Sequence, residues 1–314
     1  RITADRFFVN ATTAILHAGA TFSASGYDQR GVDVSQGSSV GVANSAGGSG
    51  AGHVNAGGSS STQPGGGIYG SLYKADTPGS RGGAAGSDTG AFGGSVIEIH
   101  SDTLTLDGML DVRGESPGST SKAGAGSGGS VWINTRLLYG DEDGDVDARG
   151  GTAASTEAGS GSGGRVAFYF DESQYRGVTQ TEGGSGSNPG GAGSTYLRQQ
   201  LSEFKVWETL VIDNNNHGWD VPYVFGEGSK VSYEFHEVHI LNHAAVLLSE
   251  ATHTLVINKV VSDHTGLIHV QGNDTVVADV IPFRESVTRT PINYKVDAGG
   301  VLQLTATNAA AVQL

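Results

Sequence analysis

Short strand-like apolar runs alternate with glycine-rich stretches, and the same arrangement returns along the chain. Gly-Gly pairs that lead into such runs begin at Gly93, Gly128 and Gly163, so both steps are 35 residues long. A weaker fourth copy begins at Gly191. Self-similarity at a fixed period of this length is typical of repeat architectures, in which each unit buries its apolar face only against its neighbours.

Two further repeats support this interpretation. Residues 107–114 and 143–150 match at an offset of 36, with identical Asp, Gly, Asp, Arg and Gly positions. Residues 243–247 align with 264–268 at an offset of 21, and 297–302 form a looser third copy. A period near 21 suits one coil of a parallel β-helix, and the 35-residue units suit the same coil with a long loop at one corner.

The patterns therefore predict an all-β chain folded as a right-handed parallel β-helix, or β-solenoid, with long Gly/Ser-rich loops. No sustained 3.6-residue apolar pattern predicts a helix. We expect the strands that follow Gly-Gly to stack in register, so that Val96, Ile97 or Ile99 lies beside Val131 or Ile133, and these beside Val166 or Phe168. Tandem β-sandwiches are the alternative, because evenly spaced strands with turn signals are typical of them too.

Glycine divides the chain into two parts. Only 7 of the 51 glycines lie after residue 200. We therefore expect glycine-rich β-helix coils over residues 1–200 and glycine-poor coils over 201–314. The chain begins at Arg1 without Met, which predicts a processed product or a segment of a longer chain.

Residues 35–93 form the longest Gly/Ser tract, and they read as a loop too poor in large apolar groups to fold on its own. Its small apolar cluster is a predicted interface, since tyrosine is enriched in protein contacts. That cluster comprises Ile68, Tyr69, Leu72 and Tyr73. We expect the glycine loops to pack against each other or against neighbouring subunits, because glycine permits close backbone approach.

Charge and composition exclude several classes of binding partner and of metal site. The formal net charge of −14 disfavours nucleic acid and anionic lipid. The absence of cysteine excludes disulfides and thiolate metal sites. No apolar run approaches the ~20 residues of a membrane span, so we expect no membrane insertion.

Acidic residues alternate between positions 141 and 147, which resembles a calcium loop, because hard cations prefer several carboxylate oxygens and glycine allows the tight turn. The candidate ligands are Asp141, Asp143, Asp145 and Asp147. The alternative is a structural corner, because Asp143, Gly144 and Asp147 recur 36 residues earlier. A zinc site at His236, His239 and His243 is less favoured, since strand positions 236 and 239 point to opposite faces.

Two N-glycosylation sequons are present, at Asn10 and at Asn273. They matter only in a secreted eukaryotic chain.

No pattern marks a catalytic site. Acidic pairs such as Asp171-Glu172 read as turn residues, and no G-x-S-x-G sequence precedes a helix. We predict no enzyme and no cofactor, with calcium as the one possible ion. The competing hypothesis is a carbohydrate-binding or polysaccharide-cleaving β-helix, which a cleft lined by Trp132, Trp207 and Trp219 with two carboxylates across it would favour.

The order of the motifs resembles a class of large extracellular, glycine-rich β-helix proteins of cell surfaces and matrices. The segments that carry the resemblance are residues 64–73, 93–99, 128–133, 162–169, 191–197 and 209–214. The resemblance implies a non-catalytic structural or adhesive role outside the cell or on its surface. It also implies assembly into a fibre, matrix or surface layer, through self-association or other extracellular proteins, with carbohydrate as a further possible ligand.

Overall fold

The computed structural model describes residues 1–26, 40–217, 221–225, 232–248, 254–271, 275–279, 293–297 and 301–305. Within these ranges the regular structure is β-strand, with no helix, and therefore no helix that could cross a membrane. The chain divides into two compact units, Arg1–Trp207 and Glu208–Leu314.

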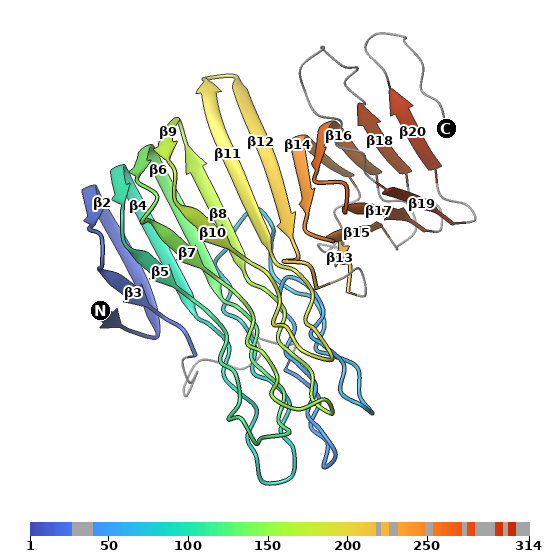
Figure 1. Cartoon of the computed structure of the whole chain (residues 1–314). Helices are drawn as coiled ribbons and strands as arrows, with labels where there is room; N and C mark the ends of the chain where they lie inside the picture. Colours follow the sequence, from blue (N-terminus) through green and yellow to red (C-terminus); the bar gives the residue numbers. More distant parts are fainter. Residues whose placement is uncertain are drawn as a thin grey trace. The chain divides into compact units, whose positions relative to one another are not determined.

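The first unit contains two sheets built from alternating segments of the chain (Figure 1). The longer sheet has the order β2 (Arg6–Leu16), β4 (Val96–Leu106), β6 (Ser130–Gly140), β8 (Arg165–Phe170) and β11 (Ser194–Ser202), and β9 (Glu172–Tyr175) also pairs with β6. The shorter sheet has the order β1 (Ile2–Thr3), β3 (Thr21–Ser23), β5 (Met109–Asp111), β7 (Asp145–Asp147) and β10 (Val178–Gln180). The described pairs within both sheets are parallel.

The predicted in-register stacking of the strands that follow Gly-Gly is confirmed, but the step from β4 to β6 is 34 residues rather than 35, so that Val96 lies beside Ser130 and not beside Val131. Ile97 pairs with Val131, which pairs with Val166. One step along, Ile99 lies beside Ile133 and Ile133 beside Phe168. These side chains are buried in one core, which also takes Leu110 and Val146 from the shorter sheet. Burial of such side chains contributes about 1.5–3 kcal/mol each, which explains why apolar positions fix the register.

The long strands change the face that they turn to the core. The residues that β4 contributes to this core are Ile97 and Ile99 at odd positions, and then Leu104 and Leu106 at even positions. Alternation with a period of two allows this only if the strand bends or slips between the two pairs. In the next repeat the long strand is interrupted at this point, because β8 and β9 are separate strands that both pair with β6.

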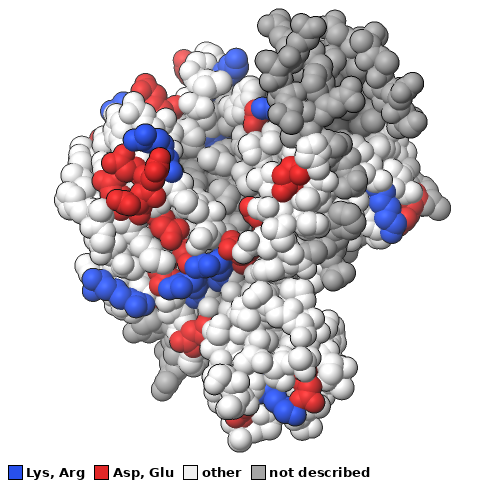
Figure 2. Space-filling view, viewed as in Figure 1, with Lys and Arg blue, Asp and Glu red and all other residues white. Residues whose placement is uncertain are grey.

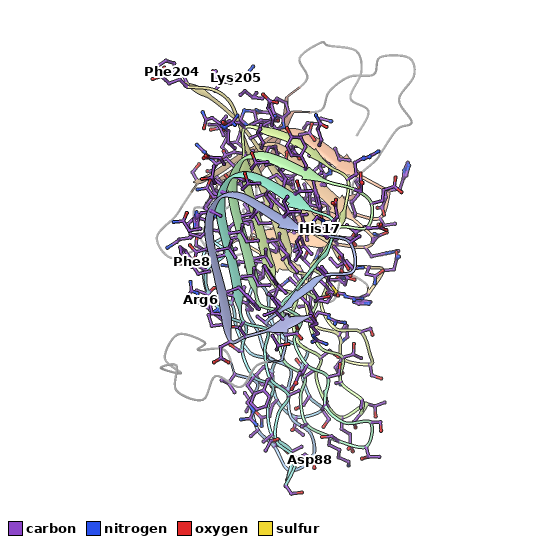
Figure 3. All side chains as sticks on the ribbon, turned by 90° about the vertical axis from the view of Figure 1, so that its left-hand side faces the viewer. Arg6, Phe8, His17, Asp88, Phe204 and Lys205 are labelled. Atoms are coloured by element: carbon purple, nitrogen blue, oxygen red, sulfur yellow. The ribbon has the colours of Figure 1, made fainter. Side chains whose placement is uncertain are left out.

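The glycine-rich segments are ordered, and they pack side by side in the part of the molecule that ends near Asp88 (Figures 1 and 3). Along residues 124–129 the backbone N–H groups bond in turn to three neighbouring segments, and every third residue returns to the same segment. The acceptors are the carbonyls of residues 83 and 80, of residues 159 and 162, and of residues 115 and 112, at 2.7–3.1 Å. A period of three is that of a polyproline II chain.

Residues 159–164 repeat the arrangement. Their N–H groups bond to residues 48 and 51, to residues 188 and 191, and to residues 151 and 148. The prediction that glycine segments pack against each other is confirmed. Residues 40–93 are ordered through main-chain hydrogen bonds to the other glycine segments, such as those of Gly48 to Lys122 and of Gly58 to Ser160, and these bonds replace the missing apolar contacts. Few charged side chains cover this part of the molecule (Figure 2).

Glycine is needed where these segments approach most closely. A Cβ added at Gly128 would lie 1.9 Å from the carbonyl oxygen of Ala148, and one at Gly126 would lie 2.0 Å from that of Phe92. Ala125, one residue before Gly126, is fully buried and tolerated.

The second unit again contains two parallel sheets. One has the order β12 (Lys205–Asp213), β14 (Ser232–Leu241), β16 (Thr254–Ser262), β18 (Thr275–Asp279) and β20 (Val301–Thr305). The other has the order β13 (Tyr223–Val224), β15 (Ala245–Leu248), β17 (Leu267–Val270) and β19 (Asn293–Val296).

The predicted offset of 21 between β15 and β17 is wrong by one residue. Ala245 pairs with Leu267, an offset of 22, and the same offset already holds between β14 and β16, where Ile240 pairs with Ser262. The extra residue in this coil therefore lies before the turn that leads into β17. The third copy at 297–302 is also misplaced, since Val301 pairs with Thr275 in the other sheet.

The prediction of an all-β chain with mostly parallel strands is confirmed. The described sheets are open, and none closes on itself.

Candidate assembly surface

In the first unit, β1 and β2 lie at the open edges of the two sheets. Among the described residues, β2 pairs only with β4, and β1 pairs only with β3. β2 is 11 residues long. An edge strand presents unpaired N–H and C=O groups, which are a template for a further strand.

Apolar side chains accompany this edge. Ile2, Phe8 and Ile15 are 58%, 62% and 54% exposed. On the core side, Phe7 and Phe22 stack with ring centroids 4.9 Å apart, and both are only half-buried. The core of the first unit therefore ends in an incompletely covered apolar layer, which we call the end layer: β1, β2 and β3.

The outward face of the longer sheet carries a row of aromatic rings (Figure 3 labels Phe8). Adjacent centroids lie 5.2–6.3 Å apart along the row. The row consists of Phe8, His100, Trp132, Tyr169 and Tyr196. The last three contacts are edge-on, with interplanar angles of 65–77°, so the rings stabilise the sheet across strands rather than forming one flat platform.

The predicted interface cluster contacts its own chain. Leu72 is buried, and the Tyr73 ring packs edge-on against Tyr196. The Tyr69 hydroxyl donates to the carbonyl of Pro78 at 2.6 Å. Ile68 alone of the four is exposed. These residues fasten the segment at 68–78 to the outer face of the sheet.

A buried histidine lies at the centre of this fastening. His53 Nδ1 lies 2.8 Å from the carbonyl oxygen of Gly128, and Nε2 lies 3.1 Å from Thr77 Oγ1. Arg165 is also buried, and its Nη2 donates to the carbonyl of Tyr69 at 2.8 Å. Burial, and then the positive charge of Arg165, lower the pKa of His53 to about 3. His53 is therefore neutral at physiological pH.

The four predicted calcium ligands do not converge. Asp141 pairs with Arg176 at 2.9 Å, while Asp147 is buried and accepts from Arg149 at 2.6 Å. Burial, and then the charge of Asp147, raise the pKa of Asp145. Asp143 is exposed. Across the described ranges no group of three or more His, Asp or Glu side chains is placed to hold a metal ion, so we propose no calcium site.

The repeated Asp-x-Arg sequence forms an ion-pair ladder. Asp111 pairs in register with Asp147, and Arg113 Nε lies 2.9 Å from the first carboxylate and 3.4 Å from the second. Burial alone would raise the pKa of Asp111, but the hydrogen bonds and charge of Arg113 outweigh burial and lower it. The identity at an offset of 36 is the signal that could have revealed this ladder.

The remaining predicted residues are dispersed. His239 pairs with Glu237 at 2.9 Å, His236 Nδ1 accepts from the Glu208 N–H, and His243 Nδ1 contacts Asn216. These histidines therefore have separate partners.

The two sequons and the other predicted site residues are placed as follows. Asn10 is exposed on β2, and Asn273 lies outside the described residues. Trp207 is partly exposed, Asp171 and Glu172 are exposed at the break between β8 and β9, and Trp219 lies outside the described residues. No family model matches the chain, and neither a curated protein nor a solved structure matches it.

Proposed function

We propose that the chain is a right-handed parallel β-helix of the extracellular, glycine-rich class, serving as a non-catalytic structural or adhesive module. In this proposal the chain is part of a fibre, matrix or surface assembly outside the cell. The observation that carries the proposal is the parallel, in-register pairing of successive repeats in two sheets that share one core. Such stacking yields a rigid body with long edges.

Two features support assembly. The end layer presents an 11-residue edge strand with exposed apolar side chains beside it. The glycine segments are held by hydrogen bonds between main-chain groups, and their close contacts give a stiff body without disulfides. Addition of a strand to the end layer would satisfy the open backbone groups and cover Phe7 and Phe22.

The test measures self-association of the purified chain by sedimentation velocity across a range of concentrations. We expect concentration-dependent oligomers, and weaker association in the double variant Ile2→Lys/Ile15→Lys, because edge lysines oppose strand pairing. Phe204→Lys is the matched control, since Phe204 is 91% exposed but lies far from the end layer (Figure 3). A chain that stays monomeric at every concentration, or a control that dissociates equally, would contradict assembly through the end layer.

A carbohydrate-binding protein is the second candidate, and the aromatic row is the observation that favours it. Phe8 and Trp132 could each offer a ring to a sugar, and Lys74 Nζ lies 5.3 Å from the Trp132 ring centroid. Binding to a glycan array that Trp132→Ala abolishes would support this function over the structural one. We propose no catalytic residues.

A further inference from the structure

We propose that Asn10 carries an N-linked glycan whose first sugar packs on the exposed ring of Phe8. The proposal rests on the extracellular location proposed above and adds a modification site to it. The sequon alone is weak evidence, because such triplets arise by chance. The structure adds the placement of three side chains on one strand.

Asn10 is accessible and has no competing partner. It is exposed on β2, and within the described part of the chain no hydrogen bond joins its side-chain amide. Thr12, the third sequon residue, is also exposed, two positions along the strand. The polar neighbours of Asn10 are already paired, since Arg6 and His100 both contact Glu98, at 3.1 and 2.7 Å.

Phe8 supplies the apolar floor. It lies two positions before Asn10 on the same face, at about 6.5–7 Å along a strand, which is within reach of a sugar attached to the amide. Asn10 is directly opposite His100 in register, and the His100 ring lies 5.7 Å from that of Phe8. Phe8 and Arg6 point away from the interior (Figure 3).

The chemistry of an aromatic floor suits a sugar. Ring faces carry partial negative charge, which attracts the C–H groups on the apolar face of a pyranose. A large exposed apolar side chain is also unfavourable in water, so covering Phe8 would recover part of its burial energy. The glycan would lie on the face of β2, whereas strand addition uses its edge, so both are compatible.

The transfer step uses a lipid-pyrophosphate-linked oligosaccharide as donor. Asn10 Nδ2 forms a bond to the anomeric carbon as the bond from that carbon to the pyrophosphate oxygen breaks. The pyrophosphate leaves with the electron pair, and one Nδ2 proton passes to solvent. No oxidation or reduction takes place.

The test expresses the whole chain with a secretion signal in cultured animal cells, with Asn273→Gln present throughout to remove the other sequon. Wild type, Phe8→Ala, Thr12→Ala and the double variant are compared. Peptide mass spectrometry after enzymatic deglycosylation in heavy-oxygen water measures occupancy of Asn10. The same four proteins made in bacteria report the effect of each substitution without glycan.

We expect high occupancy at Asn10 and none in Thr12→Ala. The glycan should raise Tm by about 2–4 °C when Phe8 is present, and by much less in Phe8→Ala. A secreted chain with unmodified Asn10 overturns the glycan alone. A glycan that stabilises equally without Phe8 overturns the packing. A chain that folds in bacteria but is retained unglycosylated in animal cells overturns both this proposal and the extracellular location.

Discussion

Substitution of Gly128 by Ala tests the close packing of the glycine segments. The added Cβ would lie 1.9 Å from the Ala148 carbonyl oxygen and 2.6 Å from the Gly164 nitrogen, whereas real Cβ contacts essentially never fall below 3.0 Å. The carbonyl must therefore retreat by about 1 Å, the difference between 3.0 and 1.9 Å. That carbonyl accepts from Gly164 N–H at 2.7 Å, so the retreat would stretch this bond beyond hydrogen-bonding range.

Overpacking costs about 1–3 kcal/mol, and a buried, broken hydrogen bond about 1–3 kcal/mol more, so we expect destabilisation of about 2–6 kcal/mol. For a protein of this size each kcal/mol lowers Tm by about 2–4 °C. Gly118→Ala is the matched control, because a Cβ there meets nothing within 4 Å. We expect that variant to be neutral or more stable by about 0.4–1 kcal/mol.

Thermal melting and urea unfolding, followed by circular dichroism, measure both variants against wild type. The reasoning is refuted if Gly128→Ala melts within experimental error of Gly118→Ala. Equal melting would mean that the segments do not approach as closely as the hydrogen bonds require.

Two further predictions concern buried ionisable groups. The folded-state pKa of His53 is about 3 and its ordinary value is 6.5, so the unfolded chain binds the extra proton between these values and stability falls as pH falls through this window. At pH 5 this residue should make the protein about 2 kcal/mol less stable than at pH 7, and urea unfolding of His53→Gln should show a shallower pH dependence; an unchanged slope would contradict the assignment. Asp147→Asn should cost about 1–3 kcal/mol at pH 7, because Arg149 and Arg113 lose a buried carboxylate, whereas Asp143→Asn, at an exposed position, should cost much less. Equal unfolding midpoints for these two variants would show that the ion-pair ladder contributes nothing to the stability of the fold.

The sequence predicted the strand segments and much of their register. Apolar residues after each Gly-Gly pair predicted which strands stack, and the structure selected Ile97 rather than Val96 as the neighbour of Val131, because a slip of one residue would turn every apolar side chain out of the core. The predicted register failed by one residue between β15 and β17, where the offset is 22 rather than 21, as it already is between β14 and β16. The length of a coil includes the residues of its loops, which the apolar pattern does not encode.

The candidate surfaces were less predictable. The sequence predicted that Tyr69, Leu72 and Tyr73 belong to an interface, but it did not predict that the chain itself covers or contacts them. The exposure of Phe8 beside Asn10 required the structure, because neither residue type nor spacing reveals which face of β2 meets the core. The Asp-x-Arg ladder was visible as an identity without a reason until β5 and β7 were seen to pair.

The glycine segments show most clearly which features of the fold the sequence does not determine. It determined that Cβ atoms are absent at frequent positions, which permits close approach of backbones. Only the tertiary structure decided which backbones approach, with what period and in which direction. The physical reason is that the bonds along residues 124–129 and 159–164 join main-chain N–H and C=O groups, which nearly every residue type carries alike, so no side-chain pattern records their partners.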